Sequence, residues 1–253
     1  MSDLDQLVDG RHADPHSILG AHPQNGGVVV RTFRPSAERV VVRPEKGKPV
    51  DAEQVHPGGV FEAKVPKASL PLRYELEVAY PDGNTFTLRD PYAFLPTLGE
   101  LDMHLAAEGR HEDLYDKLGA HVQEIDGVVG TSFAVWAPAA RSVSVVGDFN
   151  SWDGRLHPMR ALGGTGIWEL FVPGTREGAT YKYEIHTPEG ETRLKADPLA
   201  QAAEHPPQTS SIVHRSTYEW NDDAWMQRRA QGTALDKPMS IYEVHMGSWR
   251  LNP

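Results

Sequence analysis

Apolar residues alternate with polar ones in several short stretches of the chain, which is the signature of half-buried β-strands. Phe133 and Val135 share one face of such a stretch, and Tyr181 and Tyr183 share a face of another. Turn-forming sequences separate the stretches: Pro57-Gly58, Pro81-Asp82-Gly83, Pro173-Gly174 and Pro188-Glu189-Gly190. Short alternating strands between Gly/Pro turns predict an all-β fold built from β-sandwiches.

The chain also repeats itself, and the repeat fixes the domain organisation. The matching segments are VVVRTFRPSAERVVV (28–42) with TSFAVWAPAARSVSVV (131–146), GVFEAKVP (59–66) with GIWELFVP (166–173), and YELEVAYPDGNTFTLRDP (74–91) with YKYEIHTPEGETRLKADP (181–198). Pro35 precedes its counterpart Pro138 by 103 residues, whereas the later pairs are 107 residues apart. The second copy therefore has extra residues, which fall within VGDFNSWDGRLHPMRALGG (146–164). Two copies of this length predict two tandem immunoglobulin-like β-sandwiches rather than a solenoid.

Helical signals surround the two copies. Ser2 to Val8 predicts a short helix ended by Gly10. Between the copies, Thr97 with Glu100 forms a capping-box pattern. The leucines 101, 105, 114 and 118 follow at helical spacing, Gly109 predicts a break, and Gly119 predicts the end. The expected order is a first sandwich over 1–100, a helical linker over 101–120, a second sandwich over 121–216 and a linker with a single strand over 217–253.

The composition narrows the classes of function. Lys+Arg 25 against Asp+Glu 35 gives a net charge of −10 without any basic cluster, so nucleic acid is an unlikely partner class. The chain has no cysteine, and its acidic first residues lack the apolar segment of a signal peptide. With no apolar run of membrane-spanning length, we expect a cytoplasmic protein without membrane contact.

Three motifs resemble known families. SIYEVHMGSW (240–249) resembles the first barrel strand of the α-amylase family of (β/α)8 enzymes. FAVWAPAARSVSVVGDFNSWDG (133–154) resembles a family 48 carbohydrate-binding module. DPHSILGAH (14–22) and the stretch around AFLPTLGE (93–100) are similar to the N-terminal domain and linker of 1,4-α-glucan branching enzymes. The match covers nearly the whole chain in the right order, duplication included.

The resemblance implies a cytoplasmic glycogen-building enzyme that cleaves an α-1,4-glucan and rejoins the segment through an α-1,6 bond. In that family a carboxylate nucleophile and a carboxylic acid/base on the barrel carry the double displacement. Their motifs are absent here, so no catalytic residue is expected in this chain, which would be inactive alone and would work with its own barrel downstream. Its expected partner is an α-1,4-glucan such as glycogen, amylose or a malto-oligosaccharide.

The candidate sugar site lies in GDFNSWDG (147–154). The Trp152 indole could form a flat platform for a sugar face, and Asn150 and Asp153 could bond hydroxyls. The alternative is that Phe149 and Trp152 only pack under the loop. The family resemblance favours binding at Trp152 and adds Lys182, which alternation places on an outward face and which would otherwise be one more solvated lysine.

The chain departs from the family pattern in two places, one in this site and one in the matching position of the first copy. Binding members of the module family carry a second tryptophan just after the turn, where this chain has Glu191, Thr192 and Arg193. We therefore expect weak binding, or a role that has passed to other surfaces. In the first copy Glu75 stands where Lys182 would be and no aromatic residue matches Trp152, so that copy is expected to bind nothing here.

Other polar and aromatic residues predict structure rather than chemistry. His12 and His16 are four apart, but Pro15 argues against a helix presenting both to a metal, so loop hydrogen bonds are expected. Trp136 and Trp168 fall in apolar strands and predict core positions. Trp220 and Trp225 flank an acidic turn, where packing of the linker is preferred over sugar contact. No metal site and no cofactor is expected.

Three function classes stay open from the sequence. The leading hypothesis is the accessory N-terminal half of a branching enzyme. The second is a free-standing α-glucan-binding module, and the third is a structural pair of sandwiches without a ligand. Within the α-amylase family, an isoamylase-type debranching enzyme or a trehalohydrolase also carries such a module; the duplication and DPHSILGAH (14–22) favour the branching enzyme.

Overall fold

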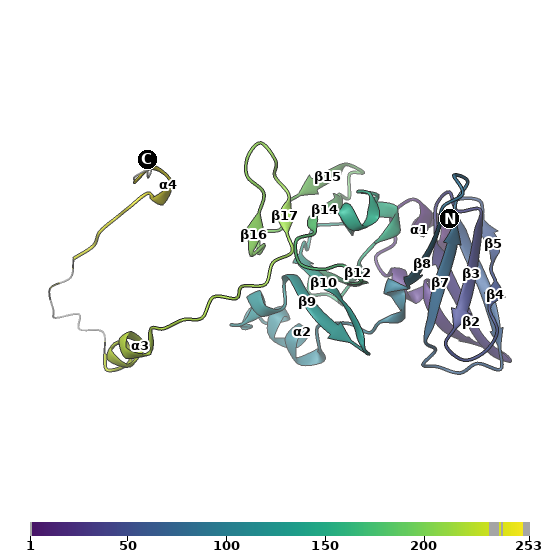
Figure 1. Ribbon diagram of the computed structural model, residues 1–253, viewed down its shortest axis with the longest axis horizontal. Coiled ribbons are helices and arrows are strands. Elements are labelled where there is room, and N and C mark those ends of the chain that lie inside the picture. The colour runs from purple at the N-terminus through teal and green to yellow at the C-terminus, as the bar shows by residue number, and fades with distance from the viewer. Residues whose placement is uncertain (1, 233–237, 239, 250–253) are drawn as a thin grey trace. The chain divides into compact units, whose positions relative to one another are not determined.

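The computed structural model describes residues 2–232, 238 and 240–249. Residues 1–216 form one compact unit and residues 217–253 form a second. The first unit contains four β-sheets and only short helices, which confirms the all-β prediction (Figure 1). No helix among the described residues is long and apolar enough to cross a lipid bilayer.

Two four-stranded sheets form the first sandwich. One has the order β1 (Gly20–Gln24), β2 (Gly27–Phe33), β6 (Val60–Pro66) and β5 (Glu53–His56). The other has the order β4 (Val50–Asp51), β3 (Arg39–Pro44), β7 (Tyr74–Ala79) and β8 (Thr85–Arg89). The alternating residues of β2, β3 and β7 face each other, so Val28, Val40 and Leu76 meet in one buried cluster.

The second sandwich repeats this plan. One sheet has the order β12 (Arg160–Ala161), β13 (Ile167–Pro173), β10 (Val128–Trp136) and β9 (Gly119–Ile125). The other has the order β11 (Ser142–Gly147), β14 (Thr180–His186), β17 (Ser211–Ile212) and β16 (Ala202–Ala203), and β15 (Thr192–Lys195) pairs with the C-terminal half of β14. Tyr181 and Tyr183 point into the core and Lys182 points out, as the alternation predicted.

The repeat extends to a buried side-chain pair. In the first copy the Tyr74 hydroxyl donates to Asp90 Oδ2 at 2.7 Å. In the second, 107 residues later, the Tyr181 hydroxyl donates to Asp197 Oδ2 at 2.6 Å. Each pair ties the central strand β7 or β14 to the segment that leaves the sandwich. The two copies therefore share an internal hydrogen-bonding plan as well as a strand order.

A continuous apolar cluster joins the two sandwiches. Leu7 of α1 (Asp3–Val8), Phe33 and Tyr92 pack in the same buried cluster as Phe133 and Tyr181 of the second copy. The Tyr92 hydroxyl also donates to the Pro158 carbonyl at 3.0 Å. Helix α1 begins after a Ser2 cap and is followed by Gly10 with φ +64°, as predicted. The N-terminal helix thus packs into the junction rather than forming a separate arm.

A buried ion pair fastens the linker to the second sandwich. Glu169 is fully buried and pairs with Arg160, which also donates to the Phe94 carbonyl at 3.3 Å. The other carboxylate oxygen of Glu169 accepts from the Thr97 hydroxyl at 2.9 Å and from its backbone N–H at 3.3 Å. Three donors, from Arg160 and from the hydroxyl and N–H of Thr97, therefore satisfy this carboxylate, which is what a buried charge requires.

The linker helix differs from its prediction. α2 spans Glu100–Ala107 and is capped at Gly99, whose N–H donates to Asp102 Oδ2 at 3.0 Å. The expected Thr97 and Glu100 capping box is wrong, because Glu169 takes the Thr97 hydroxyl. The break at Gly109 is confirmed by its φ of +66°, and a 3-10 turn over Leu114–Asp116 follows instead of a second α-helix.

Two further expectations are corrected by the structure. Trp168 is buried as predicted, but Trp136 at the end of β10 is 60% exposed and donates its indole N–H to the Thr165 carbonyl at 3.2 Å. His12 accepts from the Asp14 N–H at 3.1 Å, as expected of a loop residue. His16 does not hydrogen-bond: both ring nitrogens are buried without a partner among the described residues, and the ring meets Tyr92 edge-on with centroids 5.0 Å apart.

The second unit contains two described helices, α3 (Asp223–Ala230) and α4 (Met246–Trp249). The strand predicted over 241–249 is not present: residues 241–245 have no regular structure and the next four are helical. A single strand has no partner for its backbone groups, so the extended form has nothing to stabilise it. Trp220 and Trp225 are both exposed, and Arg229 lies over the Trp225 ring at 5.4 Å.

Candidate functional site

The extra residues of the second copy form a folded loop after β11. Two 3-10 turns, Asp148–Asn150 and Gly154–Leu156, bring the chain back toward β11. Asn150 holds the loop together: its Oδ1 accepts from the Gly147 N–H at 2.9 Å and its Nδ2 donates to the Val145 carbonyl at 2.9 Å. The same Nδ2 lies 2.9 Å from His157 Nδ1.

This geometry corrects the role expected for Asn150. Its side chain is buried, only 4% exposed, and both ends of its amide are engaged inside the loop. Because Nδ2 can only donate, the facing His157 nitrogen accepts and the ring is neutral. Burial, with a smaller effect of the Arg34 charge, lowers the pKa of His157 to about 3. Asn150 shapes the loop and has no free group for a sugar hydroxyl.

Trp152 lies at the outer corner of this loop. Its side chain is 39% exposed, and its indole N–H donates to Asp148 Oδ1 at 3.3 Å. Ser151 and Trp152 both have positive φ, +54° and +62°, in the region that non-glycine residues seldom occupy. Two consecutive left-handed residues cost on the order of 1–3 kcal/mol each, so the surrounding loop must enforce the bend that presents the indole.

Asp148 connects the indole to strand β14. Its Oδ2 accepts from the Thr180 hydroxyl at 2.6 Å and from the Thr180 N–H at 3.3 Å, while Oδ1 accepts from Trp152. The Thr180 hydroxyl is the main cause that lowers the pKa of Asp148. Thr180 lies two residues before Lys182 on the same face of β14. Asp148 therefore fixes the indole relative to the strand that carries Lys182.

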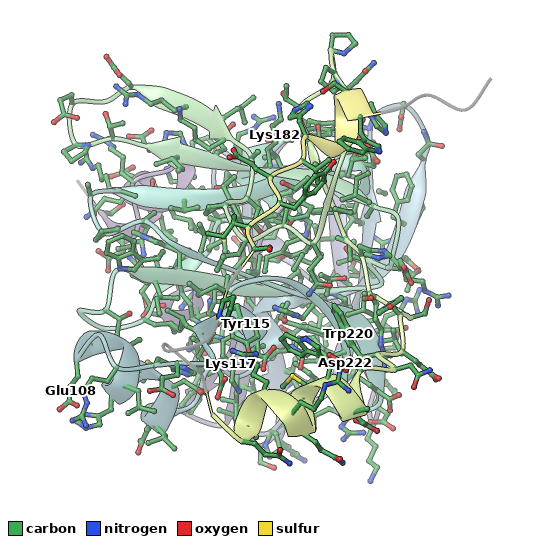
Figure 2. All side chains as sticks on the ribbon, turned by 90° about the vertical axis from the view of Figure 1, so that its left-hand side faces the viewer. Glu108, Tyr115, Lys117, Lys182, Trp220 and Asp222 are labelled. Carbon is green, nitrogen blue, oxygen red and sulfur yellow. The ribbon has the colours of Figure 1, made fainter. Side chains whose placement is uncertain are left out.

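Lys182 extends from the outer face of β14, where Figure 2 labels it. Its backbone partner is Val146, and its ammonium donates to the Thr209 hydroxyl at 2.7 Å. Leu194 of β15 pairs with Glu184, so Leu194 shares this face and is more than half exposed. Leu194 thus lies directly after residues 191–193, where binding members of the module family have their second tryptophan. An aliphatic side chain is less polarisable than an indole and would stack less well on a sugar ring.

Asp153 is half-buried and serves the loop as well. Its Oδ1 accepts from the Arg155 N–H at 3.0 Å and caps the second 3-10 turn. Its carboxylate also pairs with the Arg155 guanidinium at 2.6 Å, which lowers its pKa. The carboxylate is therefore already bonded before any sugar arrives.

Of the four residues predicted for the site, Trp152 and Lys182 present groups to the surface, whereas Asn150 and Asp153 hold the loop that carries the indole. Sequence reasoning missed Asp148, Thr180 and Thr209. Asp148 stands in the same motif as Trp152, so its position was a usable signal. Thr180 and Thr209 are distant in sequence and could be found only from the folded structure.

The first copy lacks this arrangement. Glu75, the counterpart of Lys182, lies on β7 and pairs with Arg89 of β8 at 3.5 Å. Residues 45–49 join β3 to β4 with no residue equivalent to Trp152. The exposed indole beside the central strand is thus a feature of the second sandwich and not of the first.

Comparison with known proteins assigns the two sandwiches to families. Residues 117–200 match the family model of carbohydrate-binding module 48, the isoamylase N-terminal domain. Residues 1–92 match the model described as alpha-1,4-glucan branching enzyme GlgB, N-terminal domain. The resemblance found in the sequence is therefore confirmed: the second sandwich is similar to carbohydrate-binding module 48, and the first is similar to the N-terminal domain of branching enzymes.

Individual relatives agree with the family models. The chain is 54% identical over 252 residues to the 1,4-alpha-glucan branching enzyme GlgB of Myxococcus xanthus (strain DK1622), covering 98% of this chain and 34% of that protein. It is 52% identical to the enzyme of the same name from Thermobifida fusca (strain YX), covering 99% and 34%. The chain thus spans about a third of the length of these curated relatives.

A solved structure also aligns with the chain. The pullulanase from Anoxybacillus sp. LM18-11 complexed with maltotriose has 19% identity and a TM-score of 0.33, covering 74% of this chain and 26% of that one. The identity of the chain with the branching enzymes is much higher, so the family assignment depends on those relatives.

Proposed function

We propose that this chain is the accessory part of a glycogen branching enzyme and that its second sandwich binds α-1,4-glucan at Trp152 and Lys182. The observation that carries the proposal is the exposed indole, which a strained loop presents at the surface and which Asp148 orients against β14. A loop that only packed under itself would have no need to expose this ring at the cost of two left-handed residues.

The chemistry of the site suits a neutral sugar. The indole face matches the apolar C–H face of a pyranose, and the Lys182 ammonium has two further N–H donors beyond its bond to Thr209. Stacking of one ring contributes on the order of 1–2 kcal/mol, by analogy with aromatic contacts in proteins. With one aromatic instead of two, a dissociation constant in the millimolar range is expected.

For the longer protein that contains this chain, we propose transfer of an α-1,4-glucan segment to form an α-1,6 branch in the cytoplasm. The support is the similarity to branching enzymes over 98% of the chain and the described residues, which form sandwiches and no (β/α)8 barrel. The catalytic carboxylates belong to that barrel, so the role of this chain is to hold or guide the glucan. A chain extended to the length of its relatives should lower the iodine colour of amylose without raising the number of reducing ends.

The binding proposal is tested by electrophoresis of the chain in native gels with and without soluble glycogen. Glycogen should slow the wild-type chain, and Trp152→Ala should restore most of its mobility. Trp136→Ala is the matched control, because Trp136 is an exposed indole of the same sandwich with its N–H already bonded. If the wild type and Trp152→Ala are slowed equally while both stay folded by circular dichroism, the platform does not bind glucan.

A free-standing glucan-binding module is the second candidate. The same gel result supports it, and the assay on the extended chain separates the two. A purely structural role would be favoured if no α-glucan slowed the wild-type chain.

A further inference from the structure

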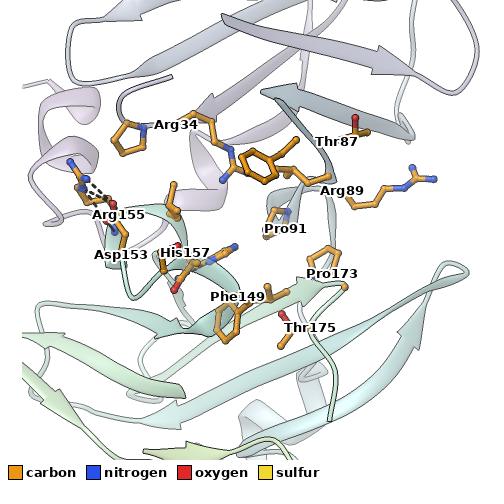
Figure 3. A pocket seen from close by; sticks show the side chains of 18 of the residues that line it. Arg34, Thr87, Arg89, Pro91, Phe149, Asp153, Arg155, His157, Pro173 and Thr175 are labelled. Carbon is orange, nitrogen blue, oxygen red and sulfur yellow. Dashed lines mark hydrogen bonds and ion pairs between the residues drawn. The ribbon is translucent and has the colours of Figure 1, made fainter. Parts of the chain in front are cut away.

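A cavity of about 670 Å³ lies between the two sandwiches; Trp152 and Lys182 do not line it, although Ser151 and Asp153 on either side of Trp152 do. Arg34 and strand β8 line it from the first sandwich, and the loop from Phe149 to His157 with Pro173 and Thr175 lines it from the second (Figure 3). Its volume is within the range of small-molecule sites, and sites of this kind are common at domain junctions. The cavity exists only because the two copies are packed together.

Arg34 is an unusual residue to line a cavity between two domains, because its charged side chain is buried. Its side chain is buried, with the residue only 4% exposed, yet its Nε and Nη2 have no hydrogen-bond partner in the part of the chain that the structure describes. Thr175, on the opposite wall, has an equally buried hydroxyl without a partner among the described residues. Buried donors left unpaired are costly, so each such group points to an absent acceptor. Figure 3 shows Arg34 directed into the space between the sandwiches.

The charges around the cavity favour a neutral ligand over an anion. Arg155 pairs with Asp153 at 2.6 Å, and Arg89 pairs with Glu75 at 3.5 Å. Arg34 acts on the buried Asp90: burial raises the pKa of Asp90 and the Arg34 charge opposes that rise. Each cation therefore has an acidic neighbour, and what Arg34 lacks is an oxygen acceptor rather than a counter-charge.

The remaining walls are apolar and partly aromatic. Phe86 is 54% exposed and meets Tyr80 edge-on, with ring centroids 6.0 Å apart. Phe149, Pro91 and Pro173 complete this surface. Flat apolar walls beside a few convergent donors suit pyranose rings, which have apolar faces and a belt of hydroxyls.

We infer that the cavity between the sandwiches is a second α-glucan site, in which Arg34 donates to adjacent sugar hydroxyls, Thr175 bonds a further hydroxyl and Phe86 covers a ring face. The inference builds on the proposed glucan binding and names a second place for it. A glucan held here would contact both sandwiches at once, which gives the first copy a part in binding although its own counterpart of the Trp152 platform is missing.

The test is a proton–nitrogen NMR titration of the whole 253-residue chain with maltoheptaose. We expect the Arg34 Nε–H signal, assigned by its loss in Arg34→Met, to shift in a saturable way together with the Thr175 amide. Phe86→Ala should weaken that titration between about twofold and tenfold, as expected for loss of one aromatic contact. Because Phe86 is exposed, this variant is expected to fold. Thr175→Val is the second variant, and it should weaken the same titration.

The Trp152 indole signal gives an independent readout of the platform. Trp152→Ala should leave the Arg34 titration unchanged, and Phe86→Ala should leave the Trp152 titration unchanged. If the Trp152 indole responds to maltoheptaose and Arg34 does not, the cavity inference is overturned while the proposed function stands. A response of Arg34 to inorganic phosphate but not to maltoheptaose would overturn the assignment of a neutral sugar. If neither signal responds to maltoheptaose, both proposals fail.

Discussion

The two sandwiches keep the same interior and differ where they meet their surroundings. Tyr74 with Asp90 and Tyr181 with Asp197 are copies of one buried hydrogen bond, with lengths of 2.7 and 2.6 Å. The outward neighbour of each tyrosine has changed from Glu75 to Lys182. Changing one partner of a buried polar pair leaves the other unsatisfied, whereas an exposed neighbour can differ between the copies without that cost.

The glutamates 62 and 169 show the same contrast at one position. They occupy matching places in β6 and β13, 107 residues apart. Glu62 forms a partly buried pair with Arg31 at 2.8 Å, and Glu169 forms the fully buried pair with Arg160, in which the Glu169 carboxylate also accepts from Thr97. Identical residues at identical strand positions are therefore expected to differ widely in their contribution to stability.

The largest effect is expected for Glu169→Gln, which leaves Arg160 buried without its counter-charge. Breaking a buried pair costs about 3–5 kcal/mol, whereas Glu62→Gln should cost less, about 1 kcal/mol, because both members of its pair keep some contact with water. Urea denaturation of both variants, followed by circular dichroism, measures the difference. Equal losses for the two variants would mean that burial does not distinguish these pairs.

A second effect comes mainly from His157 in the inserted loop, which has no counterpart in the first copy. Burial lowers the pKa of His157 from 6.5 to about 3. As the pH falls from 6.5 toward 3, His157 is therefore protonated in the unfolded chain but stays neutral in the folded chain. The unfolding free energy should therefore fall in this window, by up to about 1.4 kcal/mol per pH unit. Burial of His16, whose pKa is lowered to about 2, acts in the same direction.

Urea denaturation at pH 6.5, 5.5 and 4.5 measures this slope. His157→Gln removes the titrating ring and should flatten the slope, while the contribution of His16 remains. A slope that is the same in the variant and the wild type would show that His157 is protonated in the folded chain.

A smaller effect should separate the two tyrosine pairs. Among the described residues, Tyr74→Phe leaves Asp90 with the Tyr92 N–H as its hydrogen-bond donor, whereas Tyr181→Phe leaves Asp197 with the Leu199 N–H and the Tyr183 hydroxyl. We expect Tyr74→Phe to cost about 1–3 kcal/mol and Tyr181→Phe to cost less, about 1 kcal/mol. Chemical denaturation compares them. If Tyr181→Phe cost more than Tyr74→Phe, the number of donors left on each aspartate would not determine the cost.

The smallest effect concerns the exchanged surface residues. Lys182→Glu should weaken glycogen retardation several-fold with a change in stability within about 0.5 kcal/mol, because the site is exposed. Glu75→Lys should not create retardation, since the first copy has no indole beside this position. Native gels with glycogen measure both. Retardation gained by Glu75→Lys would contradict the assignment of binding to the second copy.

Local patterns predicted much of this fold. The period-2 alternation predicted the central strands, and Gly10 and Gly109 predicted where helices end, because each of these signals depends on neighbouring residues only. The expected Thr97 cap was wrong because its hydroxyl bonds Glu169, 72 residues away. Trp136 was expected in the core, but an apolar strand does not reveal that its last side chain projects beyond the sandwich.

In the candidate site too, local signals predicted some features and missed those that depend on the folded structure. The motif pointed to Trp152, and alternation gave the outward direction of Lys182, but residue type alone could not separate presenting residues from supporting ones. Asn150 was assigned to sugar binding because amides bond hydroxyls, and it is instead occupied by the backbone of its own loop. The unpaired Arg34 had no local signal at all, since its isolation arises from how the two copies pack.

The shared cluster around Leu7, Tyr92 and Phe133 has a consequence for protein engineering. Carbohydrate-binding modules are often treated as interchangeable parts that can be cut out at a linker and attached to another enzyme. Here a cut between the copies would expose an apolar surface on each half, so an excised second sandwich would tend to aggregate. Transplantation would have to carry residues 1–216 as one piece, and exchange between enzymes would have to respect that boundary as well.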